Sequence, residues 1–145
     1  MRLFVITTIL FFTFCCTRAQ EVQSQKIADK KGVASFYHDK FVGRKTATGE
    51  VFKNDKFTAA CNKLKLGSYV KVTNLSNGNI VYVRINDRMA ATNNRLIDLA
   101  RIAAEDLGFK ENGIAKVKVE IVPANEGKTG ILAQNEKDNA TINQL

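Results

Sequence analysis

Three short phrases hold the residue types best suited to chemistry: 45–50 (KTATGE), 58–61 (TAAC) and 83–88 (VRINDR). Glu50 ends the first phrase just after a turn, and Asp87 directly follows an apolar strand pattern in the third. Carboxylates at turns and strand ends can meet in a groove. Such groups are the raw material of general acid–base chemistry on a glycan.

Strands with a period of two are predicted to position these groups. Apolar residues alternate with charged ones over 117–121, which is typical of a half-buried strand. The segments 70–74 and 81–85 show the same alternation, and Asn77-Gly78 between them offers the positive φ angles of a tight turn. We therefore expect these two segments to form a hairpin.

Helical spacing occurs once in the same region. Apolar residues over 99–107 fall on one face, with Asp98 placed to cap the start of the helix and Gly108 to end it. Further β-like sequence lies at 32–37. The sum is a mostly β fold with one or two short helices, and several short strands in a small domain favour a closed barrel.

The N-terminus has the pattern of a secretory signal peptide. Arg2 precedes an apolar or hydroxyl-bearing run over 3–14, and Ala19 with Thr17 suits signal peptidase. The run is shorter than the roughly 20 residues that span a bilayer, and no transmembrane segment is expected. We predict cleavage after residue 19 and export to the periplasm or cell envelope. A lipid anchor at Cys16 is the less favoured alternative, because the positions before it lack the usual Leu and small residue.

The mature chain is expected to hold one domain, which fits its length. A polar lead covers residues 20–31, the folded domain covers 32–123, and a tail rich in Asn, Gln, Lys, Glu and Gly covers 124–145. Its composition predicts that this tail is disordered. We expect a monomer.

The charge favours an acidic partner. The chain carries a formal charge of +8, and +6 once Arg2 and Arg18 leave with the signal peptide. Nucleic acid is disfavoured, because the lysines are scattered, the protein is exported and no recognition helix or stacking motif occurs. The carboxylate-bearing bacterial cell wall fits better. We expect no cofactor and no metal, since His38 and Cys61 are too few ligands for a site.

An ordered series of phrases spanning about ninety residues resembles the rare lipoprotein A family. The phrases are GVASFY, GRKTATGE, TAA, LGSYVKVTNL, NG, VRINDR and RLIDL. The resemblance implies a six-stranded double-psi β-barrel, a fold shared with expansins, with a groove that holds a polysaccharide. Characterised members are septal lytic transglycosylases, which cleave peptidoglycan glycan strands between N-acetylmuramic acid and N-acetylglucosamine and leave a 1,6-anhydro end.

The resemblance also implies roles for individual residues. Asp87 would protonate the glycosidic oxygen and take a proton from the sugar's 6-hydroxyl, a task that suits a carboxyl group of raised pKa. Its alternative role is hydrogen bonding to loop backbone. Glu50 would bind sugar hydroxyls or assist the acid, unless it is a solvated turn residue. Asp98 matches a groove carboxylate of expansins, although capping the following helix is its favoured role. Thr46 and Arg88 are also expected to contact the sugar. Separately from the resemblance, Tyr37 is expected to lie under a sugar ring, although aromatic residues of small barrels more often fill the core.

Two positions depart from the family pattern. Cys61 stands where the family usually has His, and Met89-Ala90 replaces Gly-Pro after Asn-Asp-Arg. Because Cys61 occupies the position of this His, it is expected to contact the sugar. A thiol with a pKa near 8.5 is, however, a poor replacement for His as a proton-sharing or sugar-binding group. A buried small residue is the plainer interpretation of Cys61.

Three functions follow in order of preference. The first is a lytic transglycosylase. The second is a binding barrel that kept the groove and lost turnover, as expansins loosen walls without hydrolysis. The third is a protein-binding barrel such as a secreted protease inhibitor.

Overall fold

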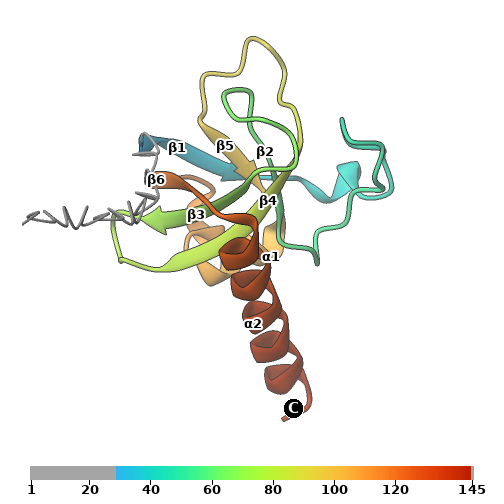
Figure 1. Ribbon diagram of the computed structural model, residues 1–145, viewed down its shortest axis with the longest axis vertical. Helices are drawn as coiled ribbons and strands as arrows, with labels where there is room; N and C mark the ends of the chain where they lie inside the picture. The colour runs from blue at the N-terminus through green and yellow to red at the C-terminus, as the bar shows by residue number, and fades with distance from the viewer. Residues whose placement is uncertain (1–28, 145) are drawn as a thin grey trace, which may run out of the picture.

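Six strands close into a barrel in the computed structural model, which describes residues 29–144 (Figure 1). The order around the barrel is β1-β5-β2-β4-β3-β6. The expected six-stranded, mostly β fold is confirmed, whereas the signal peptide lies outside the described residues. The strands are β1 (Lys30–Phe36), β2 (Thr58–Ala60), β3 (Tyr69–Asn74), β4 (Ile80–Asp87), β5 (Ile97–Leu99) and β6 (Ala115–Val122).

The expected hairpin is formed by β3 and β4, which pair antiparallel with Val70 opposite Val83 and Val72 opposite Val81. All four valines are fully buried, so the alternation places one face of each strand in the core. Gly78 in the connecting turn has a φ of +77°. Within residues 29–144 no other residue type has a positive φ, so the prediction that Asn77 shares this conformation was wrong.

Two three-residue strands complete the barrel. Strand β2 pairs parallel with β4 and antiparallel with β5, and β5 pairs parallel with β1. Every residue of β2 is buried, so its sequence lacks the alternation of polar and apolar residues that would predict a strand. Asp98 lies within β5, and the helix α1 (Arg101–Asp106) begins after Ala100 without a side-chain cap. The predicted capping role of Asp98 was therefore wrong.

The core fills the barrel and extends under α1. Phe109, which follows α1, packs edge to face against Phe36 of β1, with ring centroids 6.1 Å apart. Gly108, at φ +74°, ends the helical segment as expected. The largest fully buried side chains are Phe109, Ile85, Ile97, Leu99, Leu107, Val70, Val72, Val81, Val83, Val117, Val119 and Cys61.

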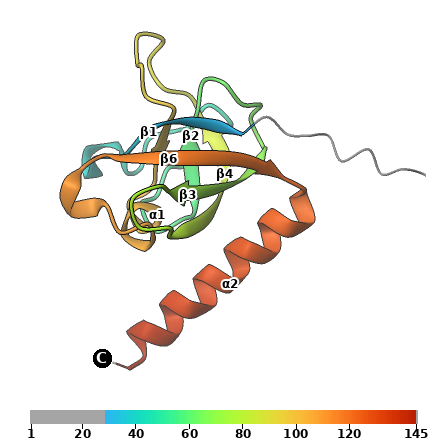
Figure 2. The same cartoon turned by 90° about the vertical axis from the view of Figure 1, so that its left-hand side faces the viewer.

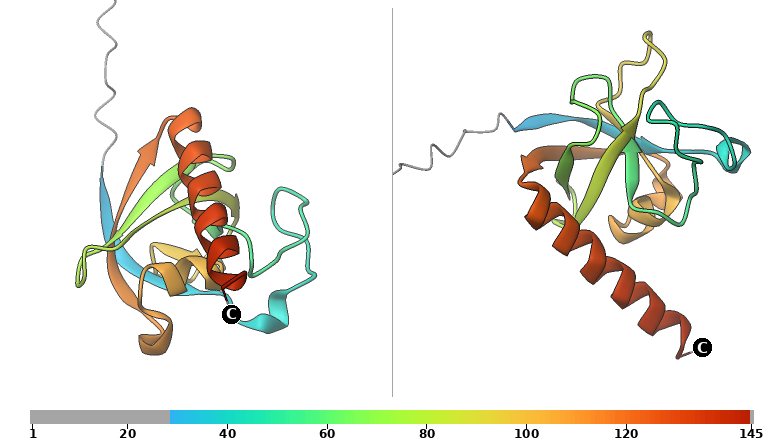
Figure 3. Two further views of the ribbon diagram at one scale, coloured as in Figure 1. Left: turned by 90° about the horizontal axis from the view of Figure 1, so that it is seen from below. Right: turned by 45° about the vertical axis from the view of Figure 1, so that its right-hand side comes forward.

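The segment expected to be a disordered tail is instead a helix, α2 (Ala124–Ile142), which starts beside the barrel and whose C-terminal end projects away from it (Figures 2 and 3). It contacts β3 and β4. Gly127 is buried against Tyr69, and a Cβ at Gly130 would lie 2.4 Å from the ring of Tyr82. The prediction was wrong because composition does not register close docking through glycines, and tertiary packing supplies most helix stability.

Gln134 ties α2 to an open edge of β4. Its side-chain oxygen accepts from the Tyr82 N–H at 2.6 Å, and its amide donates to the Tyr82 carbonyl at 2.9 Å. Strand β2 pairs with β4 only from Arg84 onward, so Tyr82 has no strand on this side. The Gln134 amide thus supplies the two hydrogen bonds that a neighbouring strand would have made.

No helix within residues 29–144 is long and apolar enough to cross a membrane.

The tight seat of Gly127 yields a test of helix docking. A Cβ built at Gly127 lies 2.3 Å from the Tyr69 Cβ, so Gly127→Ala must displace the helix or the strand. We expect this variant to lose about 1–3 kcal/mol of unfolding free energy in urea denaturation. At an exposed helix position the same change would instead stabilise by about 1 kcal/mol.

The exposed Asn139 of α2 provides the control, because Asn139→Ala raises helix propensity without touching the barrel. A stability gain in Gly127→Ala would contradict the docked position of α2.

Candidate active site

Three segments of the chain converge on the Asp87 carboxylate at the end of β4. The Tyr37 hydroxyl donates to Oδ2 at 2.7 Å. The backbone N–H groups of Ala47 and Arg88 donate to Oδ1 at 2.9 and 2.8 Å. These three donors fix the orientation of a side chain that remains partly exposed. The two backbone donors are the loop contacts of the alternative role given to Asp87, and they also restrain its carboxyl group. Proton transfer by Asp87 stays a prediction.

Tyr37 presents a neutral phenol to Asp87. Its ring lies against Phe52, with centroids 4.3 Å apart, and meets Phe41 edge-on at 5.8 Å. Burial raises the pKa of Tyr37 far above its usual value, and the hydrogen bond to Asp87 adds to the shift. The hydroxyl therefore acts as a hydrogen-bond donor to the carboxylate. Its expected sugar contact stays a prediction.

The loop that supplies the Ala47 N–H is closed by its own backbone. Lys45 and Val51 form an isolated antiparallel bridge, and the Thr46 N–H donates to the Glu50 carbonyl at 2.8 Å. Thr46 is only 7% exposed, and its hydroxyl lies 3.0 Å from that of Thr48. The Thr46 side chain thus helps to hold the loop, and its expected sugar contact stays a prediction.

Glu50 is held as an anion by its neighbours. Arg84 donates to Oε2 at 2.6 Å and Asn86 donates to the same oxygen at 3.4 Å, while Thr48 donates to Oε1 at 3.2 Å. The hydrogen bond from Arg84 is the largest cause that lowers the pKa of Glu50. A carboxyl group in this state suits electrostatic stabilisation or hydroxyl binding better than proton donation.

Asp98 and Asp87 lie on either side of β2. Ala60 pairs with Asp98 of β5 on one side and with Asp87 of β4 on the other. Two strand spacings separate their backbones by roughly 10 Å. Arg95 holds the Asp98 carboxylate through Nε at 2.7 Å and Nη2 at 2.8 Å. The fold thus brings both carboxylates to one end of the barrel, and both charges contribute to the raised pKa of Tyr37.

Cys61 supports this arrangement through its backbone. Its N–H donates to the Asp87 carbonyl at 3.2 Å, and its carbonyl accepts from the Arg88 guanidinium. The side chain is fully buried. A ligand cannot reach a buried thiol, so the expected sugar contact of Cys61 is corrected in favour of the buried small residue. The sugar contact of Arg88 stays a prediction.

Within residues 29–144 no cluster of three His, Cys, Asp or Glu side chains is placed to hold a metal ion.

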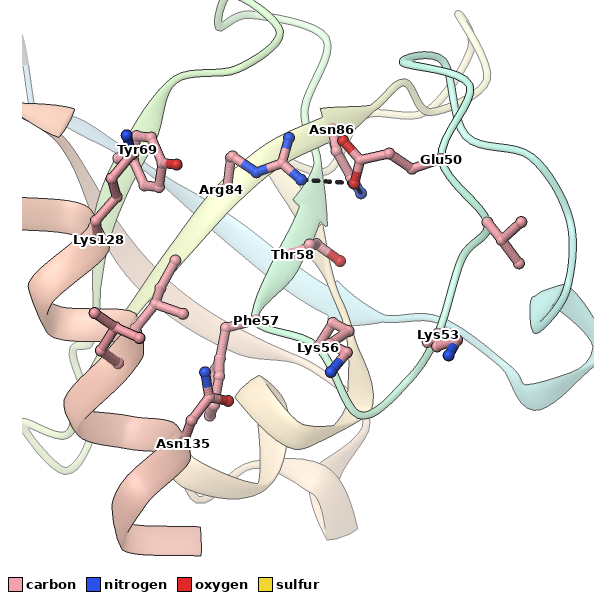
Figure 4. Close-up of a pocket in the computed structure, with 13 residues that line it drawn as sticks. Glu50, Lys53, Lys56, Phe57, Thr58, Tyr69, Arg84, Asn86, Lys128 and Asn135 are labelled. Atoms are coloured by element: carbon pink, nitrogen blue, oxygen red, sulfur yellow. Dashed lines mark hydrogen bonds and ion pairs between the residues drawn. The ribbon is translucent and has the colours of Figure 1, made fainter. Parts of the chain in front are cut away.

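A cleft of about 570 Å³ opens beside this site, between α2, β4 and the segment 50–58 (Figure 4). Glu50 and Asn86 line it, whereas Asp87 lies outside its lining. The contributions of α2 were missed because this segment was expected to be disordered. The chain's single proline, Pro123 at the helix start, was the one usable signal. The other lining residues are Val51, Lys53, Lys56, Phe57, Thr58, Tyr69, Arg84, Lys128, Ile131, Leu132 and Asn135.

The sequence matches a family model described as "Lytic transglycolase" over residues 29–119. A relative from Pasteurella multocida, described as "Endolytic peptidoglycan transglycosylase RlpA", is 43% identical over 122 residues. That alignment covers 80% of this chain and 42% of the relative. The chain therefore spans less than half the length of this relative.

Two solved structures share the barrel fold. A Streptomyces papain inhibitor superposes with a TM-score of 0.54 at 21% identity, covering 66% of this chain and 96% of that one. A variant of the Clavibacter michiganensis expansin in complex with cellohexaose superposes with a TM-score of 0.52 at 19% identity. The overlap covers 66% of this chain and 51% of the expansin. At these identities the likeness is one of fold, and it agrees with the expected double-psi barrel.

The buried phenol of Tyr37 predicts a pH dependence of stability. Its folded-state pKa lies above the value of about 10 of an unfolded chain. The stabilisation is therefore fully present below about pH 10 and is lost at higher pH, where the unfolded chain releases the phenol proton. We expect unfolding free energies from urea denaturation to fall more steeply above about pH 10 in the wild-type protein than in Tyr37→Phe. Equal slopes would contradict this assignment.

Proposed function

This chain belongs to the lytic transglycolase family, and from that membership we propose that it cleaves the glycan strands of peptidoglycan. The bond broken joins N-acetylmuramic acid to N-acetylglucosamine, and the product carries a 1,6-anhydro end. The family model covers the barrel from its first strand nearly to the end of β6. The relatives named as endolytic peptidoglycan transglycosylases support this substrate.

The single observation that carries the proposal is the convergence of donors on Asp87. Tyr37 and Ala47 donate to this carboxylate from two distant segments, and the N–H of Arg88, the next residue in the chain, adds a local hydrogen bond. A charged side chain that is restrained but partly exposed can meet a substrate with little reorganisation. We therefore assign proton transfer to Asp87.

The proposed reaction needs no water. Asp87, in its protonated form, donates a proton to the glycosidic oxygen as the bond from that oxygen to the anomeric carbon breaks. The 6-hydroxyl of the same sugar then bonds to the anomeric carbon and returns its proton to Asp87. One leaving hydroxyl and one intramolecular ether form, so the atoms and protons balance and the carboxyl group is restored.

Glu50 has a different role in this scheme. Arg84 and Asn86 keep its carboxylate ionised and fixed beside the end of β4. A fixed negative charge stabilises the positive charge that develops at the anomeric carbon, and its free lone pairs accept from sugar hydroxyls. Asp98, which lies across β2 from Asp87 and is held by Arg95, is assigned to hydroxyl binding.

The proposed site of action is the cell envelope. The N-terminal pattern of residues 1–19 directs export, and peptidoglycan lies outside the cytoplasm. Cleavage after residue 19 would leave a protein of net positive charge among the carboxylates of the wall.

A second candidate is a wall-binding barrel without turnover. It is favoured by Cys61, because the family usually has His at this position and the thiol is buried. A buried thiol cannot shuttle a proton to a ligand. The same site would then bind glycan without cleaving it.

The decisive experiment incubates the protein with sacculi, both intact and stripped of stem peptides, and identifies soluble products by mass spectrometry. We expect anhydro-ended fragments from the wild-type protein and a loss of about 100- to 10,000-fold in Asp87→Asn. The fold should survive this change. The Asn oxygen can still accept from Ala47 and Arg88, while its amide donates to the Tyr37 oxygen.

Glu50→Gln is the matched comparison, since it removes the charge of a second carboxylate of the site. We expect a smaller loss than in Asp87→Asn, because Glu50 transfers no proton. If wild-type protein sediments with sacculi but releases nothing, the binding barrel is correct. Equal release by the wild-type protein and Asp87→Asn would remove Asp87 from the mechanism.

A further inference from the structure

The exposed side chain of Asn62 joins the two loops that follow β2 and β4. Because these strands run parallel, both loops leave the barrel at the same end (Figure 1). The Asn62 side-chain oxygen accepts from the Met89 N–H at 2.9 Å, and its amide donates to the Ala90 carbonyl at 3.3 Å. One short side chain thus binds two successive residues of the loop that begins after Asp87.

These contacts extend the pairing of β2 with β4 beyond its last register pair, Ala60 with Asp87. The Cys61 N–H donates to the Asp87 carbonyl at 3.2 Å, and the Cys61 carbonyl accepts from the Arg88 guanidinium. Asn62 then binds the next two residues of the loop. Side-chain hydrogen bonds therefore continue the ladder where the two strands separate.

The loop held by Asn62 carries one of the donors to Asp87. The Arg88 N–H donates to the Asp87 Oδ1 at 2.8 Å, and the next N–H along the chain, that of Met89, is bound by Asn62. Because peptide units are planar, only the φ and ψ angles of Arg88 separate these two N–H groups. Holding the Met89 N–H therefore restrains the direction of the Arg88 N–H.

The far end of the same loop is fixed as well. The Asn93 N–H donates to the Ala90 carbonyl at 2.9 Å, so this carbonyl accepts from both Asn62 and Asn93. The Asn93 side chain accepts from the Arg95 N–H at 2.9 Å, and the Arg95 guanidinium binds Asp98. The loop between the two carboxylates is thus attached at its start through Asn62 and at its end through Arg95.

Such attachment matters because this chain lacks the Gly-Pro of the family pattern and has Met89-Ala90 in its place. A proline limits its own φ angle and also the conformations of the residue before it. Ala90 imposes neither limit. The backbone beside Asp87 would therefore be freer to move if hydrogen bonds did not hold it.

We propose that Asn62 is a positioning residue for Asp87, and that its two hydrogen bonds replace the restraint of the family's proline. The proposal rests on the proposed function, because it gives Asn62 a part in proton transfer by Asp87. Asn62 contacts no reacting atom in this scheme. It keeps the Arg88 N–H on the carboxyl group and so fixes the direction in which Asp87 presents its proton. Misplacement of a reacting group by about 1 Å can cost about 100-fold in rate.

Amide hydrogen exchange, followed by NMR, tests the contact without any substrate. In Asn62→Ala we expect the Met89 N–H to exchange about three- to tenfold faster than in the wild-type protein, because it has lost its acceptor. Asn94→Ala is the matched control, since Asn94 is an exposed asparagine of the same loop and makes no side-chain hydrogen bond within residues 29–144. Unchanged exchange of Met89 in Asn62→Ala would overturn the proposal.

Kinetics on soluble glycan strands without stems test the role in cleavage. We expect Asn62→Ala to lower kcat about ten- to 100-fold and to leave KM nearly unchanged, because Asn62 positions Asp87 without contacting the sugar. Asn94→Ala should keep the wild-type kcat. Urea unfolding curves check that each variant is folded under the assay conditions.

A double-mutant cycle tests the replacement of the proline. Asn62→Ala is compared in the native chain and in a chain that carries Met89→Gly and Ala90→Pro. We expect the loss of kcat caused by Asn62→Ala to be at least about threefold smaller in the second chain, because the proline ring then restrains the loop. An equal loss in both chains would overturn the proposal.

The remaining outcomes separate this proposal from the proposed function. A wild-type kcat in Asn62→Ala, together with faster exchange of Met89, would overturn the positioning role and leave the proposed function intact. An equal loss of kcat in Asn62→Ala and Asn94→Ala would attribute the effect to the loop as a whole and also overturn the role of Asn62. If the wild-type protein cleaves no strand, the proposed function fails and the positioning role fails with it.

Discussion

Closure of the barrel through three residues is the constraint on which the rest of the structure depends. Strand β2 joins β4 to β5, and Ala60 has Asp87 on one side and Asp98 on the other. Every residue of β2 is buried, and close packing around the strand favours its small side chains. The same pairing that closes the sheet therefore brings two carboxylates, eleven positions apart in the chain, to one end of the barrel.

The shortness of β2 has a second consequence. It leaves the backbone of Tyr82 unpaired on one side of β4, and an open strand edge invites pairing with another chain. Gln134 fills this place with two hydrogen bonds, and Gly127 lets α2 come close enough to do so. The docked helix then forms one wall of the cleft beside the site. The contacts that satisfy the open edge of β4 therefore also shape this cleft.

Two of the assigned carboxylates, Asp87 and Glu50, have different environments. Asp87 meets a neutral phenol and two backbone N–H groups, whereas Glu50 meets a guanidinium that holds its pKa low. The two carboxyl groups therefore differ in their partners, and in Glu50 the guanidinium favours the charged form. Cys61 serves this site through its backbone alone, since its thiol is buried.

The sequence by itself determined the features that rest on local periodicity and on ordered motifs. Alternation at 70–74, 81–85 and 117–121 predicted long strands, and the phrases around Glu50 and Asp87 predicted the family and its barrel. Only the tertiary structure decided the rest. Strands of three residues carry no period, the partner of Asp98 proved to be Arg95 rather than a helix end, and α2 gains its stability from contacts with β3 and β4 that no local pattern encodes. The short strands, the partner of Asp98 and the helix α2 depend on long-range packing, which the composition of a segment does not reveal.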